Sequence, residues 1–204
     1  MARQFDRNQL LAALDRVGSV AAANGETIEI AVYGGSALML ASNFRYASED
    51  VDIAQLRKPW PQWLEKVVSE IAAEHGWSED WLNDAVAFHL SPLATAEHDH
   101  VEFGTFPRNR QPSGLKVFVP SAEYMLALKL KAIRINDPVK GEQETLDILN
   151  LAKLLKLETP QEALAVLAKY FPRSAIDVEK HKFLLKHVWN REVHDAPSYA
   201  GRGG

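Results

Sequence analysis

The sequence predicts an α+β fold, in which a mixed β-sheet core with flanking helices precedes a helical last third. Up to Pro120, short apolar runs rich in β-branched residues alternate with segments of helical period. From Ser121 onward the apolar spacing is that of helices. We therefore expect an α/β core over 1–120, a helical part packed on it over 121–195, and a disordered tail over 196–204.

The composition is that of a globular protein and excludes several classes. Of the 204 residues, 47% are hydrophobic and 25% are charged, which provides enough apolar material for a sizeable core. The absence of cysteine excludes disulfides and thiolate-rich metal sites. The sequence shows neither a signal peptide nor an apolar run that could span a membrane, so we expect a cytoplasmic protein without membrane contact. The net charge of −4 argues against a broad nucleic-acid surface.

The individual elements follow from apolar periodicity and from residues that start and stop helices. In the core, the spacing predicts helices over 6–23, 36–41 and 59–75, and strands over 28–32, 48–54, 101–106 and 115–119. The least regular stretch runs from residue 77 to 112, and a further strand is expected there over 85–90. In the last third, helices are predicted from Ser121 and over 141–155, 160–170 and 177–189. Thr159 and Glu162 form a capping-box pattern for the third of these.

One stretch of the core combines a glycine turn with two acids. Gly34 and Gly35 follow the first strand, and a helix is predicted from Ser36. Glycine allows a ligand to approach the backbone closely, and a helix N-terminus attracts anions such as phosphate. Asp50 and Asp52 alternate along the next strand, which places both carboxylates on one face. Mg²⁺ is the usual ion between such acids, and the combination is typical of phosphoryl or nucleotidyl transfer.

Each feature alone has a simpler interpretation, because a glycine pair is often a tight turn and two acids are often solvated. The order and spacing of the residues are more specific. They run Gly34-Gly35-Ser36-Ala37-Leu38, Arg45, Ser48, Asp50, Val51, Asp52, then Leu115 to Leu130 with Lys129, and Leu146-Asp147-Ile148. This series resembles the signature of the polymerase-β-like nucleotidyltransferase superfamily. Over 32–172 it is most similar to small prokaryotic nucleotidyltransferase-like proteins related to the toxin of the AbiE abortive-infection system.

The resemblance implies a role for each matching residue. The implied ligands of Mg²⁺ or Mn²⁺ are Asp50 and Asp52, and the implied NTP-binding residues are Gly34, Gly35, Ser36, Arg45, Ser48 and Lys129. Lys129 and Asp147 would join the catalytic centre, although a structural salt bridge between these helices is an equal alternative. The superfamily has a third carboxylate, for which Glu102 is the best candidate, with Asp99 and Asp84 as alternatives.

Three functions are compatible with these patterns. The first is an Mg²⁺-dependent enzyme that moves an NMP from an NTP to a hydroxyl of RNA, such as tRNA, or of a protein. The resemblance then implies a toxin–antitoxin or phage-defence component with a cognate antitoxin or toxin. The second is a catalytically degenerate binding module that acts as an antitoxin or a regulatory partner. The third is a structural helical protein whose Asp-x-Asp is incidental.

Overall fold

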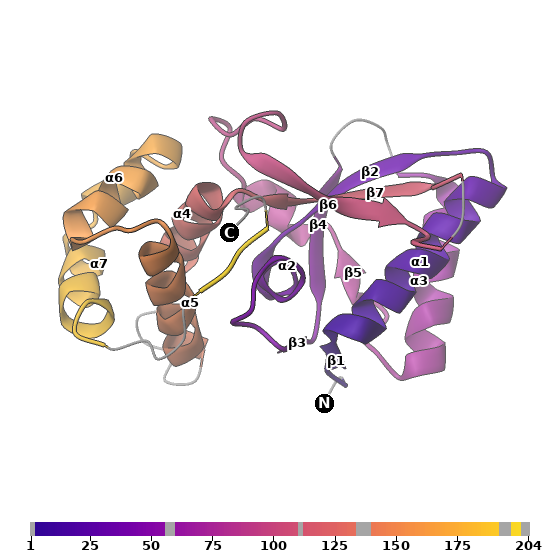
Figure 1. Cartoon of the computed structure of the whole chain (residues 1–204), viewed down its shortest axis with the longest axis horizontal. Helices are drawn as coiled ribbons and strands as arrows, with labels where there is room; N and C mark the ends of the chain where they lie inside the picture. Colours follow the sequence, from indigo (N-terminus) through magenta and orange to yellow (C-terminus); the bar gives the residue numbers. More distant parts are fainter. Residues whose placement is uncertain (1–2, 56–59, 110–111, 134–139, 192–196, 201–204) are drawn as a thin grey trace. The chain divides into compact units, whose positions relative to one another are not determined.

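The computed structural model describes residues 3–55, 60–109, 112–133, 140–191 and 197–200 (Figure 1). The chain forms two compact units. The first comprises Met1–His89 and His100–Pro120, and the second comprises Leu90–Asp99 and Ser121–Gly204. The division after Pro120 coincides with the expected boundary, but Leu90–Asp99 belongs to the second unit, which the sequence did not indicate. The positions of the two units relative to each other are not determined, so each is described on its own.

The first unit is built on a mixed five-stranded sheet, as the fold class requires. In spatial order its strands are β5 (Leu82–Asn83), β4 (Val51–Gln55), β2 (Ile28–Val32), β7 (Leu115–Pro120) and β6 (His100–Phe106). The central pair β2–β7 is parallel, whereas β2–β4 and β6–β7 are antiparallel. The short strands β1 (Phe5–Asp6) and β3 (Ala47–Ser48) pair separately. The four core strands predicted over 28–54 and 101–119 are present; β2 has the predicted bounds, and the other three are shifted at one or both ends.

Three α-helices accompany this sheet. They are α1 (Arg7–Ala23), α2 (Gly34–Ala41) and α3 (Gln62–His75). Asp6 and Gln9 form a capping box at the start of α1, and Gly76 ends α3 with a left-handed φ of 67°. Helix α1 contacts β6, β7 and α3 (Figure 1). At Gly18 this approach is so close that a Cβ would collide with the backbone of Phe106, so α1 requires glycine there.

The prediction of a strand over 85–90 is wrong, because Ala85–His89 forms a 3-10 helix, η1. Two polar residues before it set this turn. The Ala85 amide donates to the Asn83 side chain at 3.1 Å, and the Ala87 amide donates to the Asp84 carbonyl at 3.0 Å. Asn and Asp favour such local bonds over a strand ladder. No residue of η1 is buried, and Phe88 is 89% exposed, so packing does not oppose the turn.

The second unit is helical, as predicted. It contains α4 (Ala122–Ala132), α5 (Lys140–Leu154), α6 (Pro160–Tyr170), η2 (Ser174–Ile176), α7 (Val178–Phe183) and η3 (Leu184–Val188). Ser121 caps α4, and Thr159 with Glu162 forms the predicted capping box of α6. In the segment expected to be a disordered tail, 197–200 is described and Tyr199 is buried. No helix among the described residues of either unit is long and apolar enough to cross a bilayer.

Leu90–Asp99 is tied to the second unit by a buried hydrogen-bond network. The Tyr170 hydroxyl donates to Asp99 Oδ1 at 2.7 Å, and the Thr95 amide donates to Asp99 Oδ2 at 2.7 Å. The Ser91 amide donates to the Tyr124 hydroxyl at 3.0 Å. Asp99 is 7% exposed and Tyr170 is 2% exposed. Asp99 therefore has a structural role, which accounts for its burial without a metal.

This network predicts a loss of stability in alkaline solution. Burial, and then the hydrogen bond to Asp99, raise the pKa of the Tyr170 hydroxyl above its ordinary value of 10.0. Because the folded protein holds this proton more tightly than the unfolded chain, stabilisation is complete below pH 10 and declines as the pH rises above it. Denaturant unfolding should show Tyr170→Phe to be less stable at pH 7, by about 1–3 kcal/mol.

When the pH is raised above 10, Tyr170→Phe should lose less stability than the wild type, because it lacks this hydroxyl. Some alkaline dependence will remain, since burial also raises the pKa of Tyr124. Tyr46→Phe is the control, because Tyr46 is 78% exposed. If the free energy of unfolding of Tyr170→Phe declined above pH 10 as steeply as that of the wild type, the Tyr170 hydroxyl would not contribute to the alkaline loss of stability.

Candidate functional site

The glycine turn and the acidic strand meet at one edge of the sheet. Strands β2 and β4 are antiparallel with Val32 opposite Ile53, so β2 ends where β4 begins. The Tyr33 amide then donates to the Asp52 carbonyl at 2.8 Å, which continues this pairing by one residue. Helix α2 starts at the next residue, Gly34. The topology therefore places Asp52 beside the N-terminus of α2.

The Asp52 carboxylate lies directly against the backbone of Gly34. A Cβ at Gly34 would be 2.7 Å from Asp52 Oδ2, a distance at which one of them must move. Gly34 also has a φ of 65°, in the left-handed region that favours glycine. Both the space and the backbone conformation therefore require glycine here. The group that approaches the backbone here is the protein's own Asp52 carboxylate, whereas the sequence analysis expected a ligand at the glycine turn.

The two serines of the predicted site hold the backbone of Asp50. The hydroxyls of Ser36 and Ser48 both donate to the Asp50 carbonyl, the latter at 3.0 Å. Asp50 lies immediately before β4, and its side chain is exposed. The serine side chains thus fix the entry to the acidic strand from the helix and from β3. Their hydroxyls contact the protein, whereas the sequence resemblance implied contacts with a nucleotide.

A positive group lies next to the helix start. A Cβ at Gly35 would be 3.7 Å from Arg45 Nη1 and 3.4 Å from the Ser48 hydroxyl. The N-cap residue Tyr33 provides no side-chain cap hydrogen bond to α2, and the first turn contains no acid. The amides of a helix N-terminus together with a guanidinium form a favourable environment for an anionic oxygen. The predicted residues Gly34, Gly35, Ser36, Arg45, Ser48, Asp50 and Asp52 are all brought to this edge.

Glu102, the best candidate for the third carboxylate, is not brought to Asp52. Glu102 lies on β6, three strand spacings from β4, so the backbones are at least about 14 Å apart. Its carboxylate forms an ion pair of 2.8 Å with Lys116. Of the alternatives, Asp84 accepts a hydrogen bond of 3.3 Å from Trp60 Nε1, and Asp99 belongs to the network of the second unit.

Lys129 and Asp147 meet within the second unit. Lys129 Nζ lies 2.8 Å from Asp147 Oδ2, and this ion pair links α4 to α5. The side chain of Asp147 is 0% exposed and that of Lys129 is 12% exposed. This buried pair is the salt bridge that the sequence offered as an alternative to a catalytic role. The residues 134–139 between these helices, including Arg134, lie outside the described residues.

Tyr33 and His100 are two polar residues of this edge that the sequence motif did not include. The buried Tyr33 hydroxyl lies 2.8 Å from His100 Nε2, and the rings meet edge to face. His100 begins β6 opposite Pro120, at the same edge as the end of β2. The position of Tyr33, immediately before the glycine pair, was the available signal.

The donor set at this edge fits a magnesium ion that keeps other ligands. No group of three or more His, Asp or Glu side chains in the described ranges could hold a metal ion. Two carboxylates, Asp50 and Asp52, lie two residues apart at the start of β4. Mg²⁺ is commonly bound by one or two carboxylates together with water and substrate phosphates. The residues therefore suit a metal that arrives with a phosphorylated ligand better than a closed structural site.

Comparisons with known proteins add no functional assignment. No protein-family model matches the chain, and neither the curated proteins nor the solved structures contain a match. The function is accordingly argued from the site alone.

The contact between Gly34 and Asp52 predicts a specific defect in Gly34→Ala. The methyl group should displace the Asp52 carboxylate and weaken Mn²⁺ binding by about tenfold or more, measured by water-proton relaxation. Gly25→Ala is a matched control, since Gly25 has a φ of 68° and a Cβ there meets nothing within 4 Å. Both variants should lose about 1–2 kcal/mol of stability through strain, but only Gly34→Ala should lose the metal. Equal metal affinities would contradict the assigned site.

The buried ion pair predicts a large difference between single and paired substitutions. Asp147→Ala leaves the Lys129 charge buried and should reduce the free energy of unfolding by about 3–5 kcal/mol. Lys129→Met/Asp147→Leu removes both charges and should cost much less. Lys169→Met, which removes one partner of the exposed pair with Glu123, should change stability by less than about 1 kcal/mol. A paired variant as unstable as Asp147→Ala would show that the ion pair itself stabilises the unit.

Proposed function

We propose that this protein is an Mg²⁺-dependent nucleotidyltransferase that moves an NMP from an NTP to a hydroxyl of RNA or protein. The observation that supports this most is the contact of the Asp52 carboxylate with the Gly34 backbone at the start of α2. It joins a carboxylate suited to a divalent cation and a helix N-terminus suited to phosphate within one contact distance. Neither a tight turn nor a solvated acid pair requires that arrangement.

In this proposal, some residues at this edge of the sheet bind the metal ion and others bind phosphate. Asp50 and Asp52 would hold Mg²⁺, which would supply positive charge to neutralise the triphosphate and the departing pyrophosphate. The backbone amides of Gly34, Gly35 and Ser36 and the Arg45 guanidinium bind phosphate oxygens. In the transfer, the acceptor oxygen forms a bond to the α-phosphorus as the bond to pyrophosphate breaks, and the acceptor proton passes to solvent or a nearby base.

The arrangement of the first unit supports the finer fold assignment. A strand, a glycine turn and a helix are followed by an antiparallel strand that starts with Asp-x-Asp at the same edge. We assign this unit to the nucleotidyltransferase type on that basis. By the same sequence resemblance, we propose a cytoplasmic component of a toxin–antitoxin or phage-defence pair, acting on tRNA or a protein.

A second candidate is a binding module that retains the fold without efficient transfer. The position of Glu102, three strands from Asp52 and paired with Lys116, favours it, since the predicted third carboxylate is missing from the edge. Such a protein binds the NTP and Mg²⁺ but leaves the triphosphate intact. An antitoxin or a regulatory partner would need no more.

Labelled NTP distinguishes these candidates. Incubation of the full chain with Mg²⁺, α-³²P-labelled NTPs and a mixture of tRNA and protein acceptors should transfer label, and Asp52→Asn should lower the rate at least a hundredfold. Glu49→Gln is the matched control, because it removes the exposed acid immediately before Asp50 and should leave the rate unchanged.

Each result of this experiment favours or excludes one of the two candidate functions. Equal labelling by Asp52→Asn and the wild type, with both folded by circular dichroism, would exclude the assigned metal site. Saturable NTP binding that requires Asp52, without transfer to any acceptor, would favour the binding module. No NTP binding at millimolar concentration would exclude both.

A further inference from the structure

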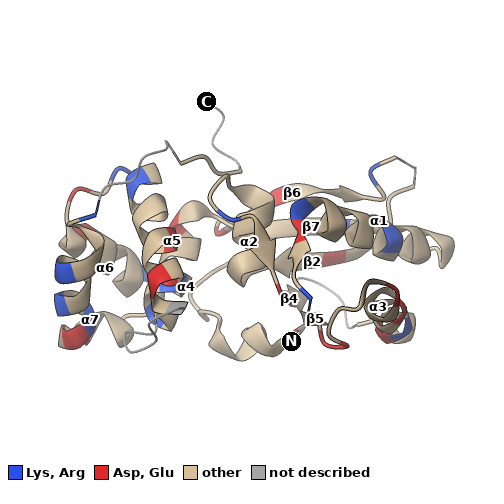
Figure 2. Cartoon of the chain, turned by 90° about the horizontal axis from the view of Figure 1, so that it is seen from below, with Lys and Arg blue, Asp and Glu red and all other residues tan. Residues whose placement is uncertain are grey.

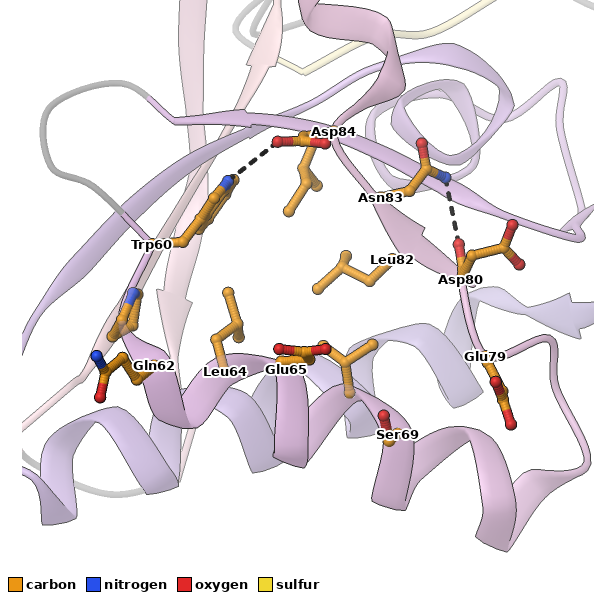
Figure 3. A pocket seen from close by; sticks show the side chains of 13 residues that line it. Trp60, Gln62, Leu64, Glu65, Ser69, Glu79, Asp80, Leu82, Asn83 and Asp84 are labelled. Atoms are coloured by element: carbon orange, nitrogen blue, oxygen red, sulfur yellow. Dashed lines mark hydrogen bonds between the residues drawn. The ribbon is translucent and has the colours of Figure 1, made fainter.

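A second candidate site lies in the first unit, between α3 and the strands β4 and β5 (Figure 3). The cavity there has a volume of about 550 Å³, within the range of small-molecule sites. It is separate from the proposed nucleotide site. Ile53 lines the cavity, and successive side chains of a strand point to opposite faces, so Asp52 faces away from it.

The described lining of the cavity is acidic. Glu65, Glu79, Asp80 and Asp84 contribute four carboxylates, and no Lys, Arg or His is among the lining residues that the structure describes. Figure 2 shows acidic positions on α3 and on the segment that leads to β5. Glu65 and Glu79 form no hydrogen bond or ion pair with any residue that the structure describes. The site therefore repels phosphates, so an NTP or an RNA strand is not its ligand.

The carboxylates surround an apolar floor. Leu64 and Val68 are buried on α3, and Leu82 faces them from β5 (Figure 3). Trp60 forms a wall, where its Nε1 donates to Asp84 at 3.3 Å. An aromatic ring next to carboxylates attracts organic cations through cation–π contact, and the floor can cover methylene groups. The lining thus matches a ligand with positive ends and an aliphatic body.

The distribution of the acids decides between a metal and an organic cation. Figure 3 shows Asp84 and Glu65 across the opening from each other, with Glu79 at one end. None of these acids belongs to a metal-binding group of three or more within the described part of the chain. Charges spread around an apolar floor suit several separated positive charges better than one compact ion.

We propose that this cavity binds a linear aliphatic amine that carries two or more positive charges. Its ammonium groups pair with the carboxylates of Glu65, Glu79 and Asp84, and its methylene segments cover Leu64, Val68 and Leu82. The inference goes beyond the proposed nucleotide transfer and does not depend on it, because the two sites use opposite faces of β4.

Calorimetric titration of the full chain with spermidine, at low salt without nucleotide, tests the proposal. Glu65→Gln/Glu79→Gln should weaken binding by about tenfold or more, since two attractive charges are lost. Ser69→Lys places a tethered cation at the cavity and should weaken it at least as much. Because these positions are exposed, both variants should fold like the wild type by circular dichroism.

Controls separate the cavity from general attraction to an acidic protein. Glu97→Gln/Glu179→Gln removes two exposed acids of the second unit and should leave spermidine affinity within about twofold. Hexanediol, which has no charge, should not bind, and butylamine, with one charge, should bind much more weakly than spermidine.

Three results would overturn the proposal. The first is no saturable binding of spermidine by the wild type at millimolar concentration. The second is equal weakening in the cavity variant and in the matched control. The third is capture of lysine-rich peptides with no affinity for free amines, which would identify a protein-docking site. NTP transfer is not read in any of these titrations, so the two proposals fail separately.

Discussion

The candidate site depends on one close contact, that of the Asp52 carboxylate with the Gly34 backbone. A side chain at position 34 would occupy the space of Oδ2, and the φ of 65° there is costly for other residues. The contact therefore fixes one residue type for both steric and conformational reasons. It also fixes the pairing of β2 with β4, because a slip of one residue would turn Asp52 to the other face.

The carbonyl of Asp50 gives this contact a second constraint. It accepts hydrogen bonds from Ser36 on α2 and from Ser48 on β3, so the segment before β4 is held from two sides. Both hydroxyls are thereby occupied within the protein. The serines of the motif stabilise the geometry of the acids, and the backbone amides and Arg45 remain the groups suited to phosphate. One sequence motif can thus combine residues that support the backbone with residues suited to a ligand.

The sequence predicted those elements whose determinants are local. The capping box at Thr159 appears where the pattern placed it, and the helix predicted over 59–75 ends at its predicted residue, where Gly76 follows. Each is set by neighbours within one turn. One failure, the strand expected over 85–90, was local, because hydrogen bonds to Asn83 and Asp84 form a 3-10 helix there. The other failures concern long-range pairing. The sequence identified Glu102 as a strand residue but contained no information on strand order, which separates it from Asp52 by two strands. In the same way, Asp99 was weighed as a metal ligand because its partner Tyr170 lies 71 residues away in the chain.

Alternation along β4 explains how one strand can serve two sites of opposite preference. Asp52 points to the face where the backbone amides of α2 and the nearby Arg45 guanidinium lie. These positive groups balance the carboxylate, so the face suits a cation together with an anion. Ile53 points to the face of α3, where four carboxylates surround apolar side chains and no base is among the described lining residues. The carboxylates of the cavity can stay ionised at little cost in free energy because they are exposed to solvent. Together they raise the local concentration of cations at this concave surface. The period of two in a strand therefore separates the edge proposed to bind phosphate from the cavity proposed to bind an amine, within two consecutive residues.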